Sequence, residues 1–91
     1  MMDFLRQAGL VFPNGKTAMT AEQIGAIVRQ ARLAQGLRQD QLAAAAGVGV
    51  RFLIELERGK PTVQLGKTLA VLAALGCRLE IALPPVGGSG S

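Results

Sequence analysis

The chain has 91 residues, enough for one small domain, and it contains no histidine, tyrosine or tryptophan. Because histidine is the commonest general base and metal ligand, its absence argues against an enzyme or a metal protein. The formal net charge of +4 favours an anionic partner such as nucleic acid, and all of it lies between Arg29 and Lys67, where seven basic residues stand against three acidic ones.

The single cysteine, Cys77, cannot form a disulfide within the chain, which is typical of proteins in a reducing compartment. No apolar run is long enough to span a membrane. The N-terminus carries Asp3 and lacks the basic region and apolar core of a signal peptide. We therefore expect a cytoplasmic protein without a membrane partner.

Residues 1–19 give a weak pattern. The turn signal Pro13-Asn14-Gly15 follows five apolar residues, Phe4, Leu5, Leu10, Val11 and Phe12. The segment Gly9–Phe12 is compatible with a short strand, and also with an arm that folds back on the core. We predict a loosely packed, flexible N-terminal arm over residues 1–19.

Thr20 begins the predicted ordered domain. Thr20-Ala-Glu-Gln23 has the pattern of a capping box, in which the Thr20 hydroxyl and the Gln23 side chain satisfy free backbone N–H groups. Gly36 is expected to end this helix, with Leu37 folding back onto its last turn. Apolar residues at helical spacing predict the buried face: Ile24, Ile27, Val28 and Ala31.

The next stretch predicts two short helices joined by a tight turn. Gln39–Ala46 forms the first helix, Gly47–Gly49 the turn and Val50–Glu57 the second helix. This arrangement is a helix-turn-helix, which places its second helix in the major groove of DNA. The inward-facing positions are expected to be Leu42, Ala43, Ala46, Leu53 and Leu56.

A further helix is predicted after Lys60. Pro61 interrupts the chain, Thr62 is expected to cap the new helix, and Gly76 is expected to stop it. The buried side of this helix is predicted to consist of its leucines: Leu65, Leu69, Leu72 and Leu75.

From Arg78 to Leu83 the apolar period changes to two, which predicts a strand that Pro84-Pro85 ends. A lone strand needs a partner for its backbone groups. We expect the same strand of a second copy, paired antiparallel in a homodimer, and pairing with Gly9–Phe12 of the same chain is the alternative. One face of the strand carries Leu79, Ile81 and Leu83.

These elements predict an all-α helix-turn-helix domain of four main helices with an added C-terminal strand. No nucleophile, base and orienting group can be assembled, so neither a catalytic site nor a cofactor or metal site is expected. The expected division of the chain is an arm (1–19), the DNA-binding domain (20–76), a dimerisation strand (77–85) and a flexible, linker-like tail (86–91).

A set of residues in order between Ile24 and Leu75 resembles the XRE, or lambda-repressor-like, helix-turn-helix family. The matching residues are Ile24-Gly25, Gly36-Leu37, Gln39, Leu42-Ala43, Gly47-Val48, Leu53, Leu56–Lys60 and Leu75-Gly76. The stretch Arg51–Thr62, followed by a helix and a terminal strand, is most similar to HipB-type antitoxins. This resemblance implies a homodimer built partly from C-terminal strands and a HipA-like serine/threonine kinase toxin as partner.

The resemblance implies that Val50, Arg51 and Glu55 face the edges of DNA bases. Arg51 can hold guanine through two hydrogen bonds, or it can form an exposed pair with Glu55 one turn later. Glu55 can accept a hydrogen bond from cytosine N4 or orient Arg51, and Val50 can meet only a thymine methyl group.

Four further residues are expected to contact the DNA backbone. By resemblance, Gln39 matches a position that touches the backbone, and Arg58 and Lys60 follow the recognition helix where the chain lies along the phosphates. The family usually has serine or threonine at the position of Arg38; because arginine is a poor cap, Arg38 is expected to extend to a phosphate instead.

The resemblance also implies an internal salt bridge between Arg32 and Glu57. A carboxylate near DNA would be repelled, which independently favours an inward-facing Glu57.

The expected function is that of a sequence-specific repressor that binds a palindromic operator as a homodimer. By resemblance, it would be a HipB-like antitoxin that represses its own operon and neutralises a HipA-like kinase. Two alternatives remain open: a free-standing XRE-type transcriptional regulator with no toxin partner, and a protein-interaction module without specific DNA binding.

Overall fold

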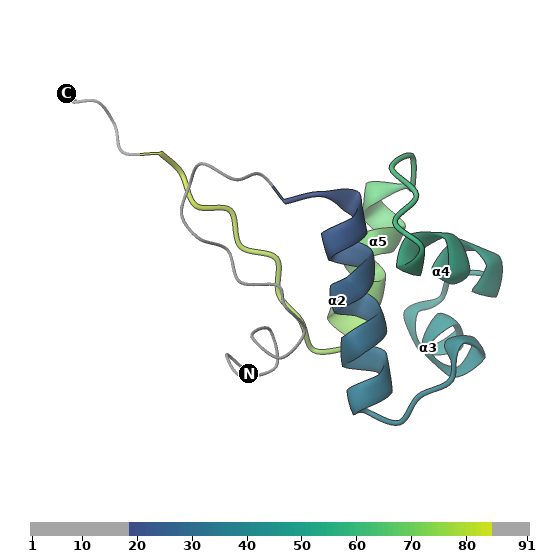
Figure 1. The fold of residues 1–91 in the computed structure, drawn as a ribbon. Helices are drawn as coiled ribbons and strands as arrows, with labels where there is room; N and C mark the ends of the chain where they lie inside the picture. The colour runs from purple at the N-terminus through teal and green to yellow at the C-terminus, as the bar shows by residue number, and fades with distance from the viewer. Residues whose placement is uncertain (1–18, 85–91) are drawn as a thin grey trace.

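The computed structural model describes residues 19–84, which form a bundle of four helices with no strand among them (Figure 1). The helices are α2 (Ala21–Ala34), α3 (Gln39–Ala46), α4 (Val50–Glu57) and α5 (Leu65–Ala74). Helix α2 packs against α4, and α3 packs against both α4 and α5. The helical part of the predicted fold is therefore confirmed. None of the helices within this range is both long and apolar enough to cross a bilayer.

Helix α2 begins and ends through the local contacts that the sequence predicts. The Thr20 hydroxyl accepts the Gln23 N–H at 3.1 Å, and the Gln23 side chain accepts the Thr20 N–H at 2.9 Å. Gly36 then adopts a φ of 70°, and the Leu37 N–H donates to the Arg32 carbonyl at 3.1 Å. Both ends are fixed by contacts within one turn, which is why sequence alone could locate them.

The helix-turn-helix also has the predicted bounds. Gly47 has a φ of 72°, in the left-handed region that favours glycine, and the Val48 N–H donates to the Ala43 carbonyl at 3.0 Å. The apolar residues of both helices meet in the core. The buried core consists of Val28, Ala31, Leu42, Ala43, Leu53, Leu56, Val71, Leu72 and Leu75.

Gly25 allows α2 to approach α4 closely. A Cβ atom at this position would overlap the carbonyl oxygen of Leu56 and would lie 2.9 Å from that of Glu57. Only glycine fits without moving one helix. The backbone of α4 is therefore seated directly on α2.

The start of α5 differs from the prediction. Thr62 lies in a turn and does not cap a helix; α5 begins at Leu65, with Gln64 at the N-cap and no side-chain capping bond. The turn at Pro61-Thr62 precedes the helix, and α5 begins two residues later than predicted and packs against α3.

The buried side of α5 also differs from the prediction. Leu65 and Leu69 are 66% and 42% exposed, whereas Leu72 and Leu75 are buried as expected. Thr68 and Val71 are buried in place of the two exposed leucines, and the Thr68 hydroxyl donates to the Gln64 carbonyl at 2.9 Å. This bond satisfies the buried hydroxyl, so a threonine can occupy a core position.

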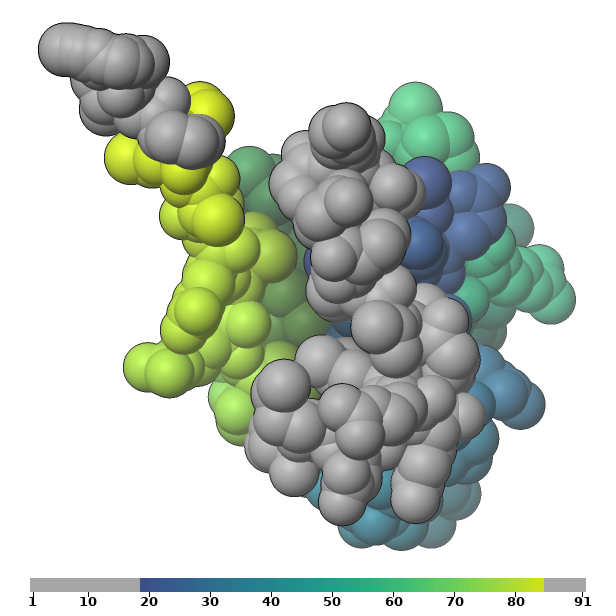
Figure 2. Space-filling model, turned by 60° about the vertical axis from the view of Figure 1, so that its left-hand side comes forward, coloured from purple at the N-terminus to yellow at the C-terminus, as the bar shows by residue number. Residues whose placement is uncertain are grey.

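The segment after α5 leaves the bundle and lies at its edge (Figures 1 and 2). Leu79, Ile81 and Leu83 are exposed, by 45%, 80% and 84%. Arg78 Nη2 lies 3.3 Å from Glu80 Oε2, so these two side chains share a face, as in an extended backbone. The strand itself stays a prediction, because a strand paired across a dimer requires a second chain.

Two further predictions lie outside the described residues: the N-terminal arm with its segment Gly9–Phe12, apart from Met19, and the tail 86–91. Among the residues that the structure describes, Cys77 is half-buried beside the core, and this burial raises the pKa of its thiol. A raised pKa disfavours the reactive thiolate, as expected for a cysteine that packs as a small apolar residue.

Candidate nucleic-acid interface

Helix α4 buries one face and presents the other to solvent. Leu53 and Leu56 point into the core. The Arg51 side chain is 89% exposed, and Val50 is exposed as well. A stripe of side chains therefore runs along the outer side of α4 at helical spacing, in which Arg51 and Arg58 are exposed and Ile54 and Glu55 are half-buried. Two of the three residues expected to read bases, Arg51 and Glu55, lie on this stripe, and the third, Val50, is the first residue of α4.

Glu55 lies between two cations. Its carboxylate is 3.3 Å from Lys60 Nζ and 4.0 Å from Arg51 Nε. Exposed pairs of this kind contribute little to stability, so both cations can leave Glu55 for another anion at small cost. The geometry keeps both predicted roles of Glu55 open, namely orienting Arg51 and contacting a base.

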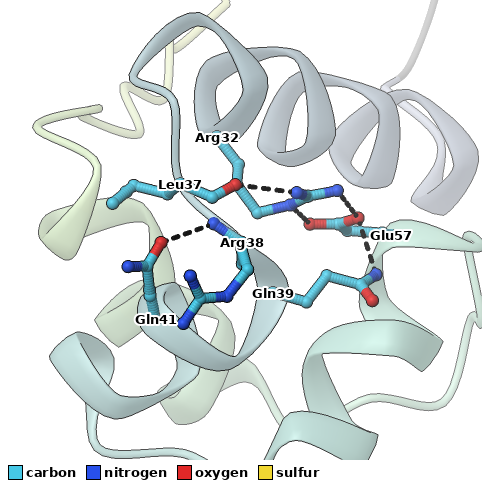
Figure 3. A network of polar contacts seen from close by, with 6 residues as sticks. All are labelled: Arg32, Leu37, Arg38, Gln39, Gln41 and Glu57. Atoms are coloured by element: carbon cyan, nitrogen blue, oxygen red, sulfur yellow. Dashed lines mark hydrogen bonds and ion pairs between the residues drawn. The ribbon is translucent and has the colours of Figure 1, made fainter.

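A polar network fixes α4 relative to α2 and α3 (Figure 3). Arg32 Nε and Nη2 donate to the two carboxylate oxygens of Glu57 at 2.7 and 3.0 Å, and Arg32 Nη1 donates to the Leu37 carbonyl at 2.9 Å. Gln39 Nε2 donates to the same carboxylate at 3.1 Å. The side chains of Arg32 and Glu57 are only 10% and 4% exposed. Glu57 is thus turned away from solvent, and its charge is neutralised inside the fold.

Arg38 lies at the exposed start of α3. Its backbone N–H donates to Gln41 Oε1 at 2.8 Å, but its side chain offers no acceptor to the helix (Figure 3). The guanidinium instead pairs with Asp40 at 3.0 Å. This hydrogen bond lowers the pKa of the Asp40 carboxyl and raises the pKa of Arg38. The first amides of α3 therefore have no side-chain cap.

Arg58 ends this stripe at the C-cap of α4, Lys60 follows two residues later, and both are exposed. Arg58 lies beside a surface hollow of about 330 Å³ whose other lining residues are Arg29, Gln39, Ile54 and Glu57. Sequence reasoning did not single out Arg29 as a site residue. Its position in the basic part of the chain was the one sequence feature that could have indicated a DNA contact. The residues that surround it in the hollow come from other helices, so no local sequence pattern links them.

Gly59 sets the direction in which the chain leaves α4. It has a φ of 84°, and a Cβ there would lie 2.9 Å from the Cα of Glu22 at the start of α2. This close approach holds the turn that carries Arg58 and Lys60 against α2. The backbone that carries Arg58 and Lys60 is therefore packed against α2.

Comparison with known proteins identifies the family of this chain. A family model described as helix-turn-helix (HTH_3) matches residues 28–81, more than half of the chain. The chain is also 55% identical over 69 residues to the uncharacterized HTH-type transcriptional regulator y4mF of Sinorhizobium fredii (strain NBRC 101917 / NGR234), a match that covers 76% of this chain and 91% of that protein. The chain therefore belongs to the XRE-like helix-turn-helix family.

Proposed function

We propose that this protein is a transcriptional repressor that binds operator DNA through α4. The observation that carries the proposal is the stripe on the outer side of α4, which the core and the Arg32–Glu57 network hold in place while its Arg51 side chain is 89% exposed. The family and the net charge of +4 support the same partner. The name of the related protein, an HTH-type transcriptional regulator, agrees with a regulatory role.

In this proposal the exposed residues divide by the part of DNA they contact. Val50, Arg51 and Glu55 meet base edges in the major groove. The residues that hold the phosphate backbone are Arg38, Gln39, Arg58 and Lys60. Because Arg38, Arg51 and Lys60 lie in exposed pairs with carboxylates, they can exchange these partners for DNA.

The proposed repressor acts as a homodimer. The support is the extended segment Arg78–Leu83, which exposes Leu79, Ile81 and Leu83 on one face and has no strand partner within residues 19–84. A second copy would cover these side chains and pair the backbone. A two-fold dimer then presents two α4 helices to a palindromic operator, whose half-sites lie about 34–36 Å apart.

The finer proposal is a HipB-like antitoxin that represses its own operon and neutralises a HipA-like serine/threonine kinase. It rests on the similarity of Arg51–Thr62, and of the helix and extended segment that follow, to HipB-type antitoxins. A free-standing regulator without a toxin is the alternative. Co-purification with a kinase encoded beside its gene supports the antitoxin, and a freely separable pair contradicts it.

An anisotropy titration tests DNA binding directly. The full chain is titrated onto the DNA upstream of its own gene and onto an unrelated duplex of equal length, at two salt concentrations. A specific repressor prefers the upstream DNA, and its affinity falls steeply with salt. Equal, weak binding to both duplexes contradicts the proposal and favours the protein-interaction module.

The variant Arg51→Ala tests the base contact. Removing a two-bonded contact to guanine should cost about 1–3 kcal/mol on the operator and should leave affinity for the unrelated duplex almost unchanged. An equal loss on both duplexes would instead place Arg51 on the phosphates.

A further inference from the structure

The hollow between α2, α3 and the end of α4 brings together side chains that lie far apart in the sequence. Arg29 comes from α2, Gln39 from the first turn of α3, and Ile54 and Arg58 from α4 and its C-cap. With a volume of about 330 Å³, it is an open basin on the surface. Its chemistry follows from which of its charges are already paired.

The negative charge in this basin is already neutralised. Glu57 accepts two hydrogen bonds from Arg32 and one from Gln39, and its side chain is only 4% exposed. The positive charges remain available. Within residues 19–84, neither Arg29 nor Arg58 has a carboxylate within ion-pair distance, and both are exposed. The basin therefore offers two guanidinium groups to an outside anion.

The basin is also continuous with the DNA-reading stripe of α4. Ile54 and Arg58 follow Arg51 by three and seven residues, so all three share one face of the helix. A duplex that meets Arg51 with its base edges must place a sugar–phosphate strand beside this face. The start of α3, whose first amides have no side-chain cap, borders the same basin at Gln39.

We propose that Arg29, Gln39 and Arg58 form a seat for a single DNA phosphate, and that Arg29 is a backbone contact in its own right. This inference rests on the proposed DNA binding and adds α2 to the elements that touch DNA. The guanidinium groups of Arg29 on α2 and Arg58 at the end of α4 hold the phosphodiester oxygens, and Gln39 Nε2, which donates one hydrogen to Glu57, offers its second N–H from α3. The seat fixes the register of α4 in the groove without reading sequence.

The first test is the salt dependence of Arg29→Ala. Loss of one phosphate contact should weaken binding to the operator and to the unrelated duplex by the same factor. It should also reduce the slope of log affinity against log salt by about 0.9 for each bound protomer. Arg29→Lys should keep the slope but not the full affinity. Gln30→Ala, an exposed neighbour on α2, is the matched control and should bind like the unchanged protein.

The second test locates the phosphate. Operator duplexes with a neutral methylphosphonate at successive backbone positions are titrated with the unchanged protein, Arg29→Ala and Arg58→Ala. At one position per half-site, the neutral linkage should weaken the unchanged protein but should cost each variant much less. Both variants must lose sensitivity at the same position if the two arginines share one phosphate.

The outcomes separate this seat from the wider function. Unchanged affinity and slope in Arg29→Ala, on an operator that the unchanged protein binds specifically, would overturn the seat alone. A reduced slope without any shared position would also overturn it, because Arg29 would then act only as diffuse charge. If the unchanged protein shows no salt-dependent DNA binding, both the seat and the proposed repressor fail.

Discussion

At the scale of single residues, the site depends on which charges are held inside and which are free. Glu57 and Arg32 are almost completely buried and satisfy each other, whereas Arg51, Arg38 and Lys60 form only exposed pairs. A buried pair is costly to break, because its remaining member is left as an uncompensated charge. An exposed pair exchanges partners easily. The internal pair therefore serves positioning, and the exposed cations are the ones available to DNA.

Replacement of Arg32 by alanine should be strongly destabilising. The buried Glu57 carboxylate would keep only the hydrogen bond from Gln39, so we expect the free energy of unfolding to fall by about 3–5 kcal/mol. Urea denaturation measures the loss. Arg38→Ala is the control: its pair with Asp40 is exposed, so its urea midpoint should match that of the unchanged protein. Similar losses of unfolding free energy in the two variants would show that the buried pair contributes no more to stability than the exposed pair.

At the scale of elements, helix ends could be predicted better than helix faces. The ends of α2 and the turn at Gly47 depend on contacts within one turn, and the structure reproduces them. The buried face of α5 depends on where α3 lies, and the prediction that its leucines form that face is wrong for Leu65 and Leu69. The basin at Arg29 needs three elements at once, so no local pattern could indicate it.

The contact of α2 with α4 at Gly25 gives a prediction for an element as a whole. In Gly25→Ala, the added methyl group would overlap the Leu56 carbonyl, so the two helices must move apart. Overpacking of this kind costs about 1–3 kcal/mol, which exceeds the roughly 0.5–1 kcal/mol that alanine contributes to a helix. Thermal unfolding should show the loss, and operator affinity should fall although Gly25 is buried beneath α4.

Gly66→Ala is the matched control for this prediction. Gly66 lies in α5, and a Cβ there would meet no atom within 4 Å. The same substitution should leave stability unchanged or slightly higher. If both variants were neutral, the close approach of α2 and α4 would not be needed to seat the recognition helix.

At the scale of the whole molecule, the described chain ends in a segment that its own helices do not cover. Ile81 and Leu83 are 80% and 84% exposed, whereas the buried core formed within residues 19–84 has nine apolar residues. A core this small is marginal, and apolar side chains left in water could add to it across a dimer. The alternating sequence pattern predicts the apolar face, but a strand is defined by backbone hydrogen bonds to a neighbouring strand. In the proposed dimer that neighbouring strand belongs to the second chain.

A substitution on the apolar face of Arg78–Leu83 should therefore disrupt the dimer, and the same substitution on the other face should not. Ile81→Lys places a charge on the apolar face and should shift the protein to a monomer in sedimentation experiments, with a loss of operator affinity because two half-sites are no longer linked. Ala82→Lys adds the same charge one residue later, on the other face, and should remain a dimer. If both variants sediment alike, or if the unchanged protein is monomeric at the concentrations that saturate its operator, the paired strand is wrong. The two copies of α4 would then have to be brought together by another surface or by the DNA itself.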